Sequence, residues 1–222
     1  MYKKLLIALL AMSTFAVLSS ADFARVEAGA GVWNQEPTVA LNNGISSVED
    51  KENDIYVWAY VKHFVPVIPN FRLEHVTATA DNLEFSQTDI IPYYNILDNT
   101  AWITIDLGID FKMIDLTLES PMGSISTSDA DSMVLPLGYV RTRIQLPFSG
   151  FGAEADVKYV SYSDNTVYDA RLKVDYTFDI TPLVQPGIEI GYRVQKIETD
   201  ELLPISINSE FSGIYAGAIL RF

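Results

Sequence analysis

Charged residues alternate with uncharged ones in several segments of this 222-residue chain. Successive side chains of a β-strand point to opposite faces, so this spacing places the charges of each strand on one face. Opposite charges on neighbouring strands then pair in a low dielectric, where an unpaired charge costs several kcal/mol. We predict a charge network with five bases, Arg141, Arg143, Arg171, Lys173 and Arg193, and six acids, Asp106, Asp110, Glu154, Asp156, Asp175 and Glu189.

The chain has no Cys and two His residues, His63 and His75. A metal site needs several converging ligands, and no group of His and acidic residues has that spacing here. Both histidines fall on the apolar face of their predicted strands, near a strand end, which is typical of residues at a membrane interface. We therefore expect no metal and no cofactor.

A hydrolase would need a nucleophile, a base and an orienting acid in one place. Ser161 and Ser163 lie near a predicted strand end, but no histidine is placed to activate them. One weak alternative brings His75 together with Asp81 or Asp89 at the rim of the sheet. The chain has no Gly-x-Ser-x-Gly elbow and no phosphate-binding loop. The sequence favours a protein that is not an enzyme.

Period-2 alternation recurs along the chain and predicts strands. From Ile103 to Phe111 the odd-numbered residues are apolar, and apolar residues move to even positions near Lys112, which indicates a bulge there or a strand rising above a membrane. The least regular segment, 84–97, contains Pro92, which is unusual in a fully paired strand; without it, eight strands are the alternative. The predicted strands are 23–33, 54–64, 70–79, 84–97, 100–119, 135–146, 151–162, 167–178, 187–198 and 210–222.

Short and long connections alternate between these strands. Transmembrane β-barrels have tight periplasmic turns and longer outer loops, and their even strand number leaves both termini on the periplasmic side. The predicted fold is all-β, a transmembrane antiparallel up-and-down β-barrel of ten strands. The short turns are 65–70, 98–99, 147–150 and 179–186, and the longer connections include 35–53, 120–133 and 199–209.

Two observations favour lipid outside the barrel over a soluble, lipocalin-like barrel. The chain ends in an alternating strand whose apolar face includes Ala218, Leu220 and the terminal Phe222, and we interpret these residues as a C-terminal assembly signal. Eleven of the 15 Lys and Arg residues share the polar strand faces, as side chains paired across a small lumen would. The charge network is therefore predicted to lie in the lumen.

The N-terminus has the features of an export signal. Lys3 and Lys4 precede an apolar stretch, Leu5–Leu18, and Ser19 and Ala21 suit signal-peptidase cleavage. We expect a signal peptide over 1–21, a single barrel domain over 22–222, and residence in the outer membrane of a Gram-negative bacterium. Periplasmic chaperones and the barrel-assembly machinery are the partners expected during biogenesis.

The net charge of −14 argues against nucleic acid as a partner. Many of the acids fall in loops and turns, where they would lie beside lipopolysaccharide. They either bind the divalent cations that bridge lipopolysaccharide or simply keep the loops soluble. The expected partners of the folded barrel are outer-membrane lipid and lipopolysaccharide, and the sequence predicts no oligomeric state.

Several stretches along the chain have a familiar order. They are Gly29–Gln35, Val65–Glu74, Tyr93–Asn99, Asp106–Gly108, Tyr162–Asp164, Tyr168–Arg171, Gly191–Arg193 and Tyr215–Gly217. In these stretches the chain resembles a family of small proteobacterial outer-membrane β-barrel proteins of unassigned activity. The resemblance implies the fold and the location, supports a strand over 84–97, and brings no catalytic residue. This chain departs from the family in its shorter second outer loop.

Three functions are compatible with these features. The first is a structural or surface-interaction role with a lumen plugged by charges. The second is a small diffusion channel, in which the same charges form a constriction for ions or small solutes. The third, an outer-membrane hydrolase at the rim, rests on the weak His75 arrangement alone.

Overall fold

The computed structural model describes residues 24–41, 44–46, 51–65, 67–80, 83–118, 125–126, 133–163, 165–181, 183–199 and 207–222. The signal peptide predicted over 1–21 lies outside these residues. Within them, no helix has the length and apolar character needed to cross a membrane.

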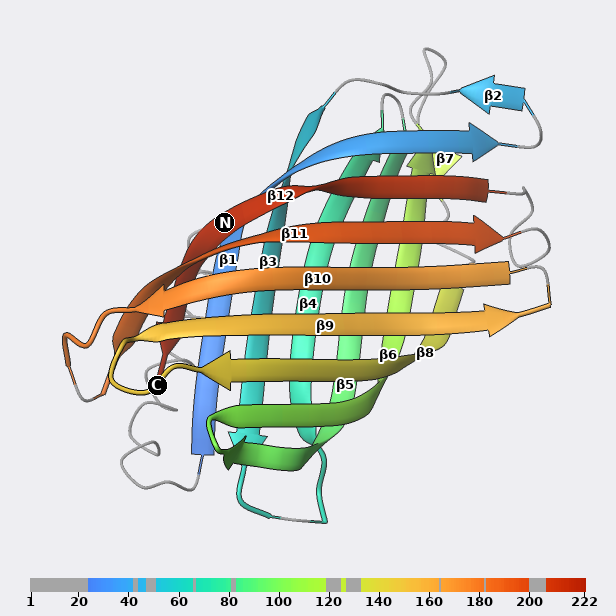
Figure 1. Ribbon diagram of the computed structural model, residues 1–222. Coiled ribbons are helices and arrows are strands. Elements are labelled where there is room, and N and C mark those ends of the chain that lie inside the picture. Colours follow the sequence, from blue (N-terminus) through green and yellow to red (C-terminus); the bar gives the residue numbers. More distant parts are fainter. Residues whose placement is uncertain are drawn as a thin grey trace, which may run out of the picture.

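Ten long strands form one antiparallel sheet that closes on itself, because β12 pairs with β1 (Figure 1). Two short strands, β2 (Gly44–Ser46) and β7 (Ile125–Ser126), pair with the ends of β1 and β6, respectively, at the end of the barrel away from the C-terminus. The ten-strand prediction is confirmed and the eight-strand alternative is wrong. The long strands are β1 (Ala24–Leu41), β3 (Glu52–His63), β4 (Asn70–Ala80), β5 (Leu83–Thr100), β6 (Ile103–Leu118), β8 (Met133–Gln145), β9 (Phe151–Tyr162), β10 (Asn165–Thr177), β11 (Gln185–Thr199) and β12 (Ile207–Arg221).

The irregular segment 84–97 lies within β5, as the resemblance indicated. Pro92 pairs with Phe71 of β4, but the pairing of β5 with β6 skips Ile91 and Pro92. Pro has no N–H to donate to a ladder, so an interruption on one side lets it sit within a strand. The register of β5 against β6 shifts only later, between Asn95 and Thr100. From Glu84 to Tyr94 inward and outward side chains still alternate, but the inward face includes the apolar Phe85 and Ile91 and the outward face includes the polar Glu84, so the sequence shows no clear polar alternation.

The side chains are distributed as in a transmembrane barrel. On β6, Leu107 and Ile109 point outward and are 43% and 50% exposed, whereas Asp106 and Asp110 point into the lumen and are fully buried. Outward apolar residues and inward charged residues recur on the other long strands. A soluble barrel has the opposite arrangement, so the lipocalin-like alternative is wrong.

The change of parity at Lys112 is not caused by a bulge. The pairing of β6 with β8 runs without a shift from Ile103 to Ile114, so a bulge at Lys112 is excluded. Ile114 and Leu116 are buried in the lumen, while Asp115 points away from it. The polarity of both faces is therefore exchanged at this height, as expected for a strand that rises beyond the lipid.

The last residue completes the seam between β1 and β12. The Val26 backbone N–H donates to the Phe222 carbonyl oxygen at 3.3 Å, and the Phe222 N–H donates to the Val26 carbonyl at 2.9 Å. Ala218 and Leu220 point outward from β12. Of the predicted assembly signal, Ala218 and Leu220 thus lie on the outward face of the closing strand, and Phe222 joins its backbone to β1.

Candidate functional site

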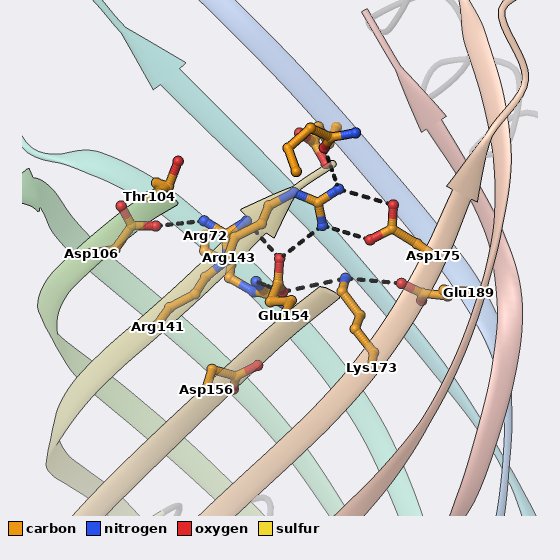
Figure 2. Close-up of polar contacts among 12 residues, drawn as sticks. Arg72, Thr104, Asp106, Arg141, Arg143, Glu154, Asp156, Lys173, Asp175 and Glu189 are labelled. Carbon is orange, nitrogen blue, oxygen red and sulfur yellow. Dashed lines mark hydrogen bonds and ion pairs between the residues drawn. The ribbon is translucent and has the colours of Figure 1, made fainter. Parts of the chain in front are cut away.

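The lumen contains a dense network of buried ion pairs, with Glu154 of β9 at its centre (Figure 2). The Glu154 carboxylate receives Arg141 Nη2 at 2.6 Å, Arg72 Nη1 at 3.2 Å, Lys173 Nζ at 3.3 Å and Arg143 Nη1 at 3.4 Å. These bases come from β4, β8 and β10 and reach the carboxylate from different sides of the lumen. A single carboxylate therefore ties together three strands besides its own.

The bases around Glu154 are themselves held by further acids. Arg143 binds both oxygens of Asp175, with Nη1 at 2.6 Å and Nη2 at 2.9 Å, in a two-pronged arrangement typical of arginine (Figure 2). Arg141 Nη1 lies 2.5 Å from Asp106, and Lys173 Nζ lies 3.0 Å from Glu189. Each of these charges is compensated inside the barrel.

A second group of ion pairs lies closer to the end of the barrel that carries the longer connections, which we call the loop end; the opposite end, with the short turns, is the turn end. Lys112 Nζ lies 2.7 Å from Asp89, and Lys158 contacts Asp89 as well. Lys158 Nζ also lies 2.6 Å from Glu74 across the lumen. The remaining predicted bases join this group: Arg193 lies 2.6 Å from Asp169, and Arg171 lies 2.8 Å from Asp156.

The structure thus places the eleven predicted network residues in the lumen, and ten of them are in ion pairs; Asp110 is the exception. The network also includes eight residues that were not assigned to it. Strand alternation put seven of these on the polar faces, whereas Asp89 was missed because it lies in the irregular segment. The eight are Glu27, Arg72, Glu74, Asp89, Lys112, Lys158, Asp169 and Arg221.

Aromatic rings fill the spaces between these charges. Trp58 lies between Arg72 and Lys173, whose charged groups are 5.3 and 4.7 Å from the ring centroid. Its Nε1 donates to Glu189 at 3.0 Å. A Cβ on Gly29 would lie 2.4 Å from the Trp58 ring, so the absence of a side chain at Gly29 makes room for the indole. The Trp58 indole is therefore packed directly against the charged groups of the network.

An apolar layer fills the lumen on the loop side of the charges. It includes Trp33 and Phe211, which are both fully buried, and Phe85, whose ring centroid lies 5.2 Å from that of Phe211. Other inward residues of the same layer are Val39, Val76, Ala78, Ile114, Leu116, Leu135, Val167 and Ile197. The barrel thus has a core like that of a soluble protein above its charged layer.

On the turn side of the charges the lumen is open. A cavity of about 1290 Å³ is lined by the turns and by the inward residues nearest to them, and Arg141 and Arg143 lie at its inner end. Among the charges themselves, the described residues enclose a space of only about 10 Å³, enough for one water molecule. The lumen is therefore a vestibule that is open at the turn end and blocked above it.

The barrel wall has a notch at its loop end. The pairing of β3 with β4 stops at Tyr56–Val76, although β3 remains paired with β1 to Glu52 and β4 with β5 to Ala80. Lumen side chains close the gap. The Thr79 N–H donates to Asp54 Oδ2 at 3.1 Å, and the Thr79 carbonyl accepts from Gln35 Nε2 at 2.8 Å.

Asp54→Ala should open this notch locally. The substitution removes the acceptor of the Thr79 N–H, and a hydrogen bond to a carboxylate contributes about 1.5–3 kcal/mol. We expect exchange of the Thr79 amide hydrogen to become roughly tenfold to a hundredfold faster, as measured by hydrogen exchange in detergent micelles. Asn53→Ala is the control, because Asn53 bonds Asn34 on the outside of the wall. Unchanged exchange at Thr79 would mean that Asp54 does not hold the notch closed.

His75 and Asp89 do not come together as a hydrolase at the rim would require. His75 is exposed on the outer face, where its Nδ1 lies 3.0 Å from Thr88 Oγ1. Asp89 points into the lumen and binds two lysines. The two side chains lie on opposite faces because Asp89 is paired with Glu74, and His75 is the next residue of β4. Asp81 lies outside the described residues.

No family model matches the chain, and no curated protein matches its sequence. Solved structures that resemble it include Neisserial surface protein A, with a TM-score of 0.40 at 11% identity over 91% of this chain and 98% of that one. The P. putida toluene transporter TodX follows, with 0.33 at 10% identity over 93% and 91%. The outer membrane protein OprG from Pseudomonas aeruginosa gives 0.28 at 12% identity over 90% and 96%.

These are distant structural matches to outer-membrane β-barrels, and at such identities they concern the fold alone. The closed antiparallel sheet and the inverted distribution of side chains assign the chain to the same class. The protein has the fold of an outer-membrane β-barrel with many buried ion pairs inside.

Proposed function

We propose that this protein is a non-conducting barrel of the outer membrane with a structural or surface-interaction role. The proposal rests on two filled layers that lie one after the other in the lumen, the network of ion pairs and the apolar layer. Ions that enter the vestibule meet Arg141, Arg143 and Glu154, which already bind one another or other buried charges. Beyond them lies the layer around Trp33, Phe85 and Phe211, which is filled by buried side chains. The buried glutamines beside these rings are hydrogen-bonded to other side chains, Gln87 to Gln195 and Gln35 to Asp54.

The surface role is supported by the part of the barrel that rises beyond the lipid. There the outward residues become polar or acidic, among them Glu36, Glu84 and Glu210, which are exposed. We propose that this region faces the lipopolysaccharide headgroups. Export through a signal peptide over 1–21, and assembly guided by the strand that ends in Phe222, belong to the same proposal.

Conductance of the mature chain in a planar lipid bilayer tests the proposal. The chain is refolded first, and its folding is checked by the heat-dependent shift in gel mobility. We expect no discrete current steps, while a general porin treated in the same way conducts. Steps that change in size on Arg141→Ala would contradict the proposal and establish the diffusion channel, with Arg141 at its constriction.

A further inference from the structure

The ion-paired charges buried in the lumen balance without Asp110, and a further buried acid, Asp54, lies apart from them at the notch, where it accepts hydrogen bonds from Gln35 and Thr79. Nine bases are each at most 8% exposed, and nine acids at most 6% exposed, and every one of them takes part in an ion pair. The bases are Arg72, Lys112, Arg141, Arg143, Lys158, Arg171, Lys173, Arg193 and Arg221. The acids are Glu27, Glu74, Asp89, Asp106, Glu154, Asp156, Asp169, Asp175 and Glu189.

Asp110 lies among these residues, on the lumen face of β6, and differs from all of them. It is fully buried, and both of its carboxyl oxygens lack a hydrogen-bond partner. On β8 it is paired with Leu137, and the register of β5 against β6 places it beside Ile91; both residues are almost completely buried. The side chain thus sits between two apolar neighbours and receives no donor.

The charged groups that face Asp110 are already engaged with other acids. Lys112 on its own strand binds Asp89 of β5, and Lys158 of β9 binds Asp89 and Glu74 of β4. A negative charge on Asp110 would therefore add to two acids nearby and would have no base of its own. A buried carboxylate without a base or a hydrogen-bond donor is strongly unfavourable.

We propose that Asp110 is a proton-binding site of the lumen, where the carboxyl group stays neutral in the folded barrel at neutral pH. With the proton bound, Asp110 adds no charge to the nine positive and nine negative groups that are ion-paired in the lumen. Loss of the proton would introduce one uncompensated negative charge beside Asp89 and Glu74. Asp110 thereby couples the stability of the barrel to pH.

Infrared spectroscopy of the refolded barrel in vesicles tests the proposal directly. At neutral pH the wild type should show the carbonyl-stretch band of a protonated carboxylic acid. The band should be absent in Asp110→Asn and should remain in Asp169→Asn, which removes an acid that is paired with Arg193. Spectra of the wild type and Asp110→Asn that coincide in this region would overturn the proposal.

The pH dependence of unfolding gives a second test. In the unfolded chain a carboxyl group ionises near pH 3.9. If Asp110 stays protonated only when the barrel is folded, wild-type stability falls as the pH rises above this value. Asp110→Asn lacks this loss, so it should gain stability relative to the wild type between about pH 5 and pH 8.

Replacement with a neutral side chain should also preserve folding at neutral pH. Asp110→Asn keeps the shape of the side chain, and Asp110→Leu continues the apolar surface of Ile91 and Leu137. At least one of the two should fold with the wild-type yield, whereas Asp169→Asn should fold less well. Loss of folding in both Asp110 variants would overturn the proposal, because it would show that the charge of Asp110 is needed.

Discussion

Glu154→Gln is expected to destabilise the folded barrel by about 3–5 kcal/mol, the cost of removing one partner of a buried ion pair. The reason lies in the number of bases that depend on this carboxylate: Arg72, Arg141, Arg143 and Lys173 all lie within 3.4 Å of it. Their other partners, such as Asp106 and Asp175, lie on different strands and cannot replace a charge at the centre of the network. Urea unfolding in lipid vesicles, followed by tryptophan fluorescence, measures the change.

The matched control is Glu198→Gln. Glu198 binds Lys196 at 2.7 Å on the same strand, and the two side chains are 38% and 26% exposed. Ion pairs at exposed positions contribute about 0–1 kcal/mol, so this variant should unfold close to the wild type. If Glu154→Gln were no more damaging than Glu198→Gln, the bases would be held by the remaining acids, and Glu154 would not be the centre of the network.

Gly31→Val is expected to prevent closure of the barrel. Gly31 pairs with Gly217 across the seam between β1 and β12. A Cβ at Gly31 would lie 2.2 Å from the Ala216 carbonyl oxygen and 2.6 Å from both Gly217 Cα and Tyr56 Oη. Two of these atoms belong to the backbone of the partner strand, so relief requires the strands to separate. The variant should lose the folded, heat-modifiable form on gels.

Gly138→Ala provides the comparison for this seam variant. A Cβ at Gly138 meets its nearest neighbour, the Tyr159 carbonyl oxygen, at 3.6 Å, which is an ordinary contact. This substitution should therefore fold with the wild-type yield. Wild-type folding of Gly31→Val would show that β1 and β12 tolerate a wider separation than the closed seam has.

Alternation in the sequence determined the strands and their faces. The period of two is a local property of extended backbone, so it can be recognised without knowing which strands are neighbours. For this reason the ten strands and the inward placement of residues such as Arg141 and Glu154 followed from the sequence. The segment 84–97 was the exception, because its inward face mixes apolar residues such as Phe85 and Ile91 with the charged Asp89, and Asp89 was therefore missed.

Only the tertiary structure decided which charges meet. Arg72 and Glu154, or Glu74 and Lys158, lie more than 80 residues apart and pair because the closed barrel brings β4 opposite β9. The apolar layer also depends on the closed barrel, because its rings come from strands far apart in the sequence, such as Phe85 of β5 and Phe211 of β12. The tertiary arrangement also leaves Asp110 without a partner. In the sequence it is one more acid in an alternating strand, and its isolation arises because the nearby lysines bind other acids.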